Sequence, residues 1–229
     1  MQEAVFIKIL TLGEQATNCY VIWTAQTREG FVIDPADAGD EISQVILDER
    51  IDLRGIILTH GHFDHALALL ELELNFPSPA YLHPADQFLL ARARSTAHHF
   101  LGRTVDPVPT ETEPLHDGQT LPFGQSALKV LHTPGHTPGS VCLSLESQNE
   151  QVYIDAINYS EHTVLFTGDT LFESGIEPLS HSYSRPLDMS ATLAKLSHLE
   201  EKTFILPGHG DGAQLHDALN FQKKPPSFE

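Results

Sequence analysis

The sequence predicts an α+β protein in which groups of strands are followed by helices. Segments rich in Val, Ile and Leu at residues 4–12, 18–25 and 30–35 are typical of strands. Between Asp40 and Arg50 the apolar side chains instead recur at helical spacing. Strands followed by a helix occur again in the second half of the chain, so we expect two similar halves.

The remaining elements follow from the same patterns. Helices are expected directly after Asp64 to about residue 75, at 84–96 and at 187–198. Strands are expected at 55–59, 80–82, 127–132, 141–147 and 203–206, with two more within 151–167. Proline-rich residues 107–114 and the segment 176–188 are expected to be loops.

Composition excludes several classes of protein. The chain has 229 residues and a formal net charge of −18, and so acidic a surface argues against a nucleic-acid partner. Its two cysteines, Cys19 and Cys142, are far apart, which fits a reducing compartment and provides no thiolate metal site. The N-terminal residues lack a signal-peptide pattern, and no apolar segment is long enough to span a membrane. We therefore expect a cytoplasmic protein, with its oligomeric state open.

Residues 59–65, with the sequence THGHFDH, are the strongest functional feature of the chain. Three imidazoles and a carboxylate fall within six positions, between a predicted strand and a predicted helix. Alternation along the extended part points His60 and His62 to one side, while Asp64 and His65 lie where the chain bends. Burying these groups without partners would cost several kcal/mol. Imidazole and carboxylate ligands without thiolate suit zinc, iron or manganese.

Three further motifs follow in the chain: TPGHTPGS at 133–140, TGDTLF at 167–172 and PGHG at 207–210. Together with the H-x-H-x-D-H pattern, this set resembles the metallo-β-lactamase superfamily. The sequences of these motifs are most similar to those of its glyoxalase II (hydroxyacylglutathione hydrolase) branch. The resemblance implies a four-layer αββα sandwich with the site at its edge. It also implies a single domain over residues 1–229, without the C-terminal helical domain that contacts glutathione in glyoxalase II.

The resemblance further implies a site for two divalent metal ions, with zinc expected first and iron or manganese as alternatives. His60, His62 and His136 would hold one ion, and Asp64, His65 and His209 the other. Asp169 would bridge the two ions, so Asp64 and Asp169 are the carboxylates expected at the catalytic centre. Asp34 matches a residue that supports the metal loop without binding metal, although an Asp before proline is also an ordinary turn residue.

Other polar residues have more ordinary interpretations. We expect His83 to cap or flank a helix and His132 to lie in a strand. Residues 92–104 carry several basic side chains, which we expect to be solvated, with the wall of a pocket for an anionic substrate as the alternative. Segment 182–188 departs from the glycine-arginine-acid motif of glyoxalase II relatives, and Tyr183 and Arg185 within it are candidate substrate contacts.

The expected function is hydrolysis of a small-molecule thioester such as S-lactoylglutathione, by attack of metal-activated hydroxide on the carbonyl. A thiol with a pKa of about 8.5 leaves without a proton, whereas an amine needs a general acid. The metal loop holds no spare acid, so thioesters are expected over amides unless a distant loop supplies one. The alternatives are a persulfide dioxygenase-like oxidoreductase with one iron, a lactonase or phosphodiester hydrolase, and an inactive metal-binding module. Gly210 favours a hydrolase, because the dioxygenase branch commonly has an acid after this histidine.

Overall fold

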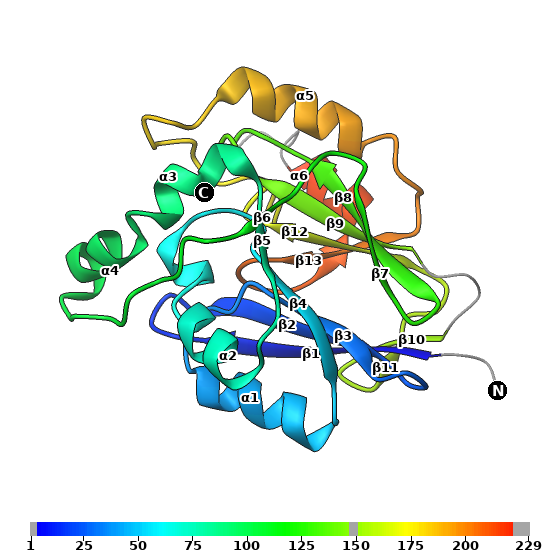
Figure 1. Ribbon diagram of the computed structural model, residues 1–229. Coiled ribbons are helices and arrows are strands. Elements are labelled where there is room, and N and C mark those ends of the chain that lie inside the picture. The colour runs from blue at the N-terminus through cyan, green and yellow to red at the C-terminus, as the bar shows by residue number, and fades with distance from the viewer. Residues whose placement is uncertain (1–3, 147–150, 222–229) are drawn as a thin grey trace.

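The structure is a computed structural model that describes residues 4–146 and 151–221, and it contains two β-sheets (Figure 1). The first sheet has eight strands in the spatial order β11 (Ile157–Asn158), β10 (Gln151–Ile154), β1 (Ala4–Leu12), β2 (Thr17–Thr24), β3 (Glu29–Ile33), β4 (Asp52–Ile57), β5 (Ala80–Leu82) and β6 (Glu113–Pro114). The second has six strands in the order β14 (Ala213–Gln214), β13 (Thr203–Pro207), β12 (Thr163–Gly168), β9 (Val141–Glu146), β8 (Ser126–His132) and β7 (Thr120–Phe123).

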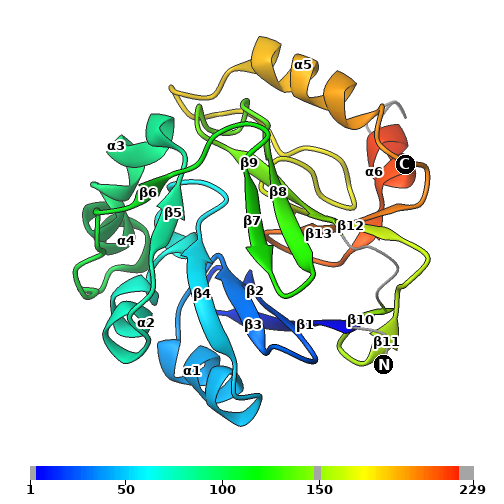
Figure 2. The same ribbon diagram turned by 45° about the vertical axis from the view of Figure 1, so that its right-hand side comes forward.

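Helices cover the outer face of each sheet. In Figure 1, α1 (Gly39–Asp48) and α2 (Leu69–Asn75) lie below the first sheet, and α5 (Pro186–Leu196) lies above the second. Figure 2 shows α6 (Leu215–Phe221) beside β12 and β13. The layers are therefore helix, sheet, sheet and helix, which confirms the predicted α+β sandwich.

The alternation of side chains along β2 shows how the layers are joined. Tyr20 and Ile22 belong to the apolar core between the two sheets. Cys19, Val21 and Trp23 face the other way and pack in the cluster beneath α1 and α2. Because both faces of this strand are covered, β2 is buried along its whole length.

The helix predicted directly after Asp64 begins later than expected. Residues Phe63–His65 form one 3₁₀ turn, and α2 starts only at Leu69. The backbone N–H groups of Leu67 and Ala68 donate to the carbonyl oxygens of Ala36 and Pro35. These bonds to a distant loop take the place of helical ones, so the tertiary contact overrides the helical pattern.

Other element boundaries also differ from the predictions. The helix expected at 84–96 is a 3₁₀ turn (Pro84–Asp86) followed by α3 (Gln87–Leu90) and α4 (Ala93–Leu101). The segment 151–167 contains parts of three strands rather than two, and residue 147 of the predicted strand 141–147 lies outside the described residues. Strands β7 and β14 and helix α6 were not predicted, and the short strand β6 lies at the end of the expected loop 107–114. No helix within residues 4–146 and 151–221 is long and apolar enough to cross a membrane.

Hydrogen bonds between the two sheets fix the edge where the sequence motifs meet. Asn18, at the start of β2, donates from its backbone N to Gly208 O (2.7 Å) and from Nδ2 to the carbonyl oxygens of Pro207 (3.1 Å) and Gly210 (2.8 Å). Tyr20 Oη donates to Pro207 O at 2.6 Å. The end of β13 is thereby held against the first sheet.

Candidate metal centre

Four loops bring the candidate ligands to one edge of the sandwich, after the C-terminal ends of β4, β8, β12 and β13. Asp34 fixes the first loop, because its carboxylate accepts hydrogen bonds from Thr59 N and Thr59 Oγ1, both at 2.7 Å. Its Oδ2 also lies 3.0 Å from His65 Nδ1. Asp34 has a φ of 52°, so it combines the turn conformation with support of the loop.

The first group of side chains that could hold a metal ion consists of His60, His62, His136 and Asp169. His62 Nδ1 lies 2.9 Å from His60 Nε2 and 3.1 Å from His136 Nε2. Asp169 Oδ2 lies 3.8 Å from His60 Nε2 and 3.6 Å from His136 Nε2. The ligand-type atoms of the group all lie within 4.8 Å of one another.

The second group consists of Asp64, His65 and His209. Asp64 Oδ2 lies 3.6 Å from His65 Nε2 and 3.4 Å from His209 Nε2. Thr17 Oγ1 donates to the same oxygen at 3.3 Å, and His209 Nδ1 lies 3.1 Å from Gln15 O. The turn before β2 therefore orients two members of this group.

Asp169 lies between the two groups. Its Oδ1 is 3.4 Å from His65 Nε2, and its Oδ2 is 3.7 Å from His209 Nε2. Both Asp169 Oδ1 and His65 Nε2 are buried without a hydrogen-bond partner among the described residues, and such groups are costly unless a ligand satisfies them. Gly208 allows this packing, because a Cβ there would collide with Asp169 Oδ1. The donor set and its unsatisfied atoms fit divalent metal ions.

The protonation states of His60, His62 and Asp169 suit metal binding, and that of His65 differs. Burial lowers the pKa of His60 well below its usual range, and that of His62 to about 3. Burial opposes the charged form of His65 too, but the Asp169, Asp34 and Asp64 carboxylates outweigh it and raise its pKa. Burial would raise the pKa of Asp169, yet His65 and then His60 hold it well below its usual range. His60, His62 and Asp169 are therefore in the neutral-imidazole and carboxylate forms that bind metals, whereas His65 has to release a proton when a metal binds.

Asp86 is a buried carboxylate that the sequence did not reveal, since an acid in the first turn of a helix is common at the surface. Its Oδ2 accepts from Gly61 N (2.9 Å) and Thr137 Oγ1 (2.6 Å), and its Oδ1 accepts from Gly139 N (2.6 Å). Asp86 thus joins the loop of His60 and His62 to the loop of His136.

A cavity of about 610 Å³ opens onto these side chains. Its lining contains His62, Asp64, His136, Asp169 and His209 from the two groups, together with Gln15, Gly61, Phe63, Leu89, Arg92, Thr96, Phe100, Glu177, His181 and Tyr183. The cavity therefore joins the candidate ligands to α3, α4 and the segment before α5.

The segment before α5 places Tyr183 and His181 beside the ligands. Tyr183 Oη lies 2.8 Å from His62 Nε2, and the His181 ring stacks on the Tyr183 ring at 5.0 Å. His181 also contacts the His62 ring, at 5.3 Å between centroids, so the loop supplies an acid–base group that the metal loop lacks. Arg185 does not line the cavity; its guanidinium lies 3.8 Å from Asp188.

The arginines of the basic segment 92–104 differ in whether they line the cavity. Arg94 Nε donates to Val105 O, and Arg103 pairs with Glu14 at 3.1 Å and Asp37 at 2.7 Å, outside the cavity. Arg92 is exposed, as predicted, and it also lines the cavity, which is the alternative interpretation of this segment. His83 caps the next turn as predicted, because its Nδ1 accepts from Ala85 N. His132 ends β8, as predicted.

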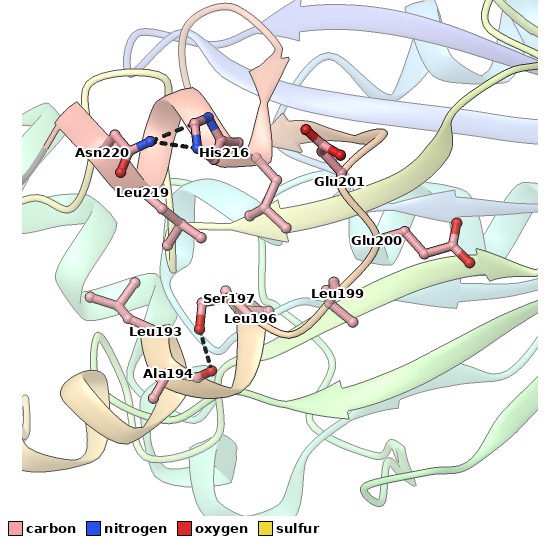
Figure 3. A pocket seen from close by; sticks show the side chains of 11 residues that line it. Leu193, Ala194, Leu196, Ser197, Leu199, Glu200, Glu201, His216, Leu219 and Asn220 are labelled. Carbon is pink, nitrogen blue, oxygen red and sulfur yellow. Dashed lines mark hydrogen bonds between the residues drawn. The ribbon is translucent and has the colours of Figure 1, made fainter.

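A second cavity, of about 660 Å³, lies between α5 and α6, away from the histidine cluster (Figure 3). Leucines from both helices line it, together with Glu200, Glu201, His216 and Asn220 (Figure 3). None of the candidate ligands lines this cavity. We therefore place the functional site at the first cavity, although it is slightly smaller.

Comparison with known families matches residues 12–149 to the model of the metallo-beta-lactamase superfamily. This match covers more than half of the chain. The chain belongs to the metallo-beta-lactamase superfamily.

Relatives in this superfamily match nearly the whole chain. An uncharacterized protein of Mycobacterium tuberculosis is 31% identical, over 89% of this chain and 90% of that protein. Hydroxyacylglutathione hydrolase GloC of Haemophilus influenzae is 27% identical, over 89% of this chain and 90% of its own length.

Solved structures agree with this assignment. A protein crystallised in a di-iron-bound form is 30% identical, with a TM-score of 0.76 over 91% of this chain and 95% of that chain. The BLEG-1 B3 metallo-beta-lactamase is 27% identical, with a TM-score of 0.76 over 93% of this chain and 96% of that chain. The chain is thus a metal-binding hydrolase of this superfamily, with its His/Asp cluster at the metal centre.

Proposed function

We propose that this hydrolase cleaves thioesters of the hydroxyacylglutathione class. The observation that carries the proposal is the full-length similarity to hydroxyacylglutathione hydrolase GloC, joined to a cavity that opens onto both groups of ligand-type side chains. His60, His62, His136 and Asp169 would hold one divalent ion, and Asp64, His65 and His209 a second that shares Asp169. Zinc is the first candidate, and the di-iron-bound relative makes iron the second.

When bound, metal ions supply Lewis-acid activation of water and of a carbonyl oxygen. The residues of the chain provide the rest of the site. Asp34 and Asp86 hold the metal loops in place through hydrogen bonds to backbone N–H groups. Phe63, Leu89 and Phe100 provide apolar surface along the cavity that can exclude water from a bound acyl group.

The leaving group decides between thioesters and amides. A thiolate departs without protonation, so the site needs no general acid for a thioester. An amide such as a β-lactam needs one, and His181 is the available imidazole in the cavity. The similarity to the BLEG-1 B3 metallo-beta-lactamase makes β-lactam hydrolysis the second candidate function.

Parallel steady-state kinetics on metal-loaded protein would test the proposal. The substrates are S-lactoylglutathione, a small acyl thioester, a lactone and a β-lactam, with oxygen uptake measured on glutathione persulfide. We expect kcat/KM to be highest for a thioester. The proposal is refuted if the protein hydrolyses neither thioester but turns over another substrate rapidly. Oxygen uptake with the persulfide would establish the dioxygenase alternative.

A further inference from the structure

One wall of the site cavity is built by α4 and the residues just before it. Arg92, Thr96 and Phe100 all line the cavity and follow one another at four-residue spacing, which places them on one helix face. Thr96 N donates to Arg92 O at 2.9 Å, so Arg92 lies in the first turn of this wall. Phe100 stacks on Phe63 at 5.9 Å, which connects the wall to the metal loop.

Among the described residues that line this cavity, Arg92 is the only lysine or arginine. Among the described residues, no carboxylate lies within ion-pair distance of its guanidinium, whose contact is the Phe88 ring at 5.9 Å. The chain has 31 acidic and 13 basic residues, and most of its described basic side chains pair with a carboxylate. Arg50 and Arg94 also lack such a pair among the described residues, but neither of them lines the cavity. Arg103, eleven positions later, pairs with two carboxylates. Within the described part of the chain, the positive charge of Arg92 is thus not neutralised by a carboxylate.

We propose that Arg92 binds a carboxylate of the substrate, away from the reacting thioester. The proposal rests on the proposed function, and it assigns a specificity-determining residue that recognises carboxylate-bearing thioesters. A guanidinium matches a carboxylate through two parallel hydrogen bonds. One cation in a cavity that also contains Glu177 suits a single carboxylate better than a multiply charged phosphate group.

A chain of ring contacts defines where this carboxylate would lie. The guanidinium lies over Phe88, the Phe88 ring contacts Tyr183 at 5.8 Å, and the Tyr183 ring contacts His62 at 5.9 Å. Two aromatic rings therefore separate Arg92 from the nearest candidate ligand along this path. A substrate that reaches both ends must carry its carboxylate several bonds from the scissile carbonyl.

The test compares two thioesters with the same acyl group. S-lactoylglutathione carries carboxylates on its thiol carrier, and S-lactoyl-N-acetylcysteamine carries none. The quantity to measure is the ratio of kcat/KM for the two substrates. It is measured for four metal-loaded proteins: wild type, Arg92→Ala, Arg92→Lys and the control Arg103→Ala. We expect Arg92→Ala to lower the preference for the glutathione thioester by about tenfold or more, the scale of a charge-assisted hydrogen bond. Arg92→Lys should keep part of the preference, and Arg103→Ala all of it.

A binding measurement separates this proposal from the proposed function. Calorimetry with S-hexylglutathione, which cannot be hydrolysed, reports recognition without catalysis. If neither thioester is cleaved but Arg92→Ala still weakens S-hexylglutathione binding by about tenfold, the function fails and the Arg92 assignment stands. If Arg92→Ala changes the substrate preference and the S-hexylglutathione affinity less than threefold, or no more than Arg103→Ala does, the Arg92 assignment is overturned.

Discussion

The carboxylate of Asp169 lies near four of the candidate histidine ligands. Its oxygens lie between 3.4 and 3.8 Å from ring nitrogens of His60, His65, His136 and His209. Asp34 reaches the cluster only through His65, and otherwise binds Thr59. The two carboxylates are both buried, so burial alone does not distinguish their roles.

We expect Asp169→Asn to lower kcat/KM on a thioester at least tenfold more than Asp34→Asn. A residue that only orients ligands typically costs about 10–100-fold, whereas Asp169 belongs to the ligand set itself. Kinetics and elemental analysis on metal-saturated variants would measure the difference. If Asp34→Asn lowers kcat/KM more than Asp169→Asn does, the roles assigned to the two carboxylates are wrong.

Tyr183 is expected to raise metal affinity through His62. If His62 binds metal through Nδ1, its Nε2 carries the proton and donates to Tyr183 Oη, which lies 2.8 Å away. Burial raises the pKa of Tyr183 to about 12, so the phenol stays neutral at physiological pH. Tyr183→Phe should weaken metal binding about tenfold in a chelator competition. Tyr153→Phe is the control, since Tyr153 Oη donates to the exposed side chain of Gln151. Equal effects of the two substitutions would exclude the role.

At the scale of elements, Asp86 connects loops that are far apart in the sequence. Its partner Gly139 is 53 residues away, and a Cβ on Gly139 would lie 2.6 Å from Asp86 Cγ. The turn Pro84–Asp86 thereby fixes the loop after β4 relative to the loop after β8. Asp86 therefore helps to set the position of His136 relative to His60 and His62.

Asp86→Asn should destabilise the protein by about 1–3 kcal/mol, because the new amide NH₂ faces backbone N–H donors. For a chain of this size, that corresponds to a fall in Tm of roughly 2–4 °C per kcal/mol. Thermal unfolding would measure it, with the exposed Asp106→Asn as the control. If the two variants unfold at the same temperature, the loops are held by other contacts.

Sequence patterns predicted best the elements that local apolar composition determines. The predicted bounds of strands β1, β2 and β8 lie within one residue of those found, although β2 is buried on both faces and only β8 alternates regularly. The late start of α2 depends on hydrogen bonds to Pro35 and Ala36, which no local pattern shows. Asp86 and His181 were missed for the same reason, and the place of Arg92 at the cavity was only an alternative, since the folded chain alone brings these residues to the site.

For the whole molecule, the decisive feature is that both sheets contribute to one centre. The loops after β3 and β4 bring Asp34 and His60–His65, and the loops after β8, β12 and β13 bring the other ligand-type residues. This convergence of the motifs on one site could be predicted from the sequence, because the order of the motifs resembles that of the family. The walls of the cavity come from segments outside those motifs, so substrate contacts were less predictable than the metal centre.

We expect two metal ions per chain. The two groups of ligand-type side chains share the space around Asp169, and the unsatisfied His65 Nε2 and Asp169 Oδ1 favour an occupied second group. Elemental analysis after saturation with zinc or iron should give about two equivalents for wild type, the number that two closed ligand sets would hold. His136→Ala and His209→Ala should each give about one, because each variant removes a ligand from a different group.

Removing the metals should also destabilise the fold, since an ion bound only by the native state adds its binding free energy to folding. At a free metal concentration near a thousand times Kd this is about 4 kcal/mol per site. For two sites the loss is about 8 kcal/mol, or a Tm fall of roughly 15–30 °C on chelation. Differential scanning calorimetry of loaded and chelator-treated protein would measure it, with His209→Ala showing a smaller shift than wild type. A single equivalent at saturation, together with a shift in Tm that His209→Ala leaves unchanged, would mean that only the first group binds metal. That outcome would support the mononuclear alternative, because the one-iron dioxygenase-like chemistry needs no second site.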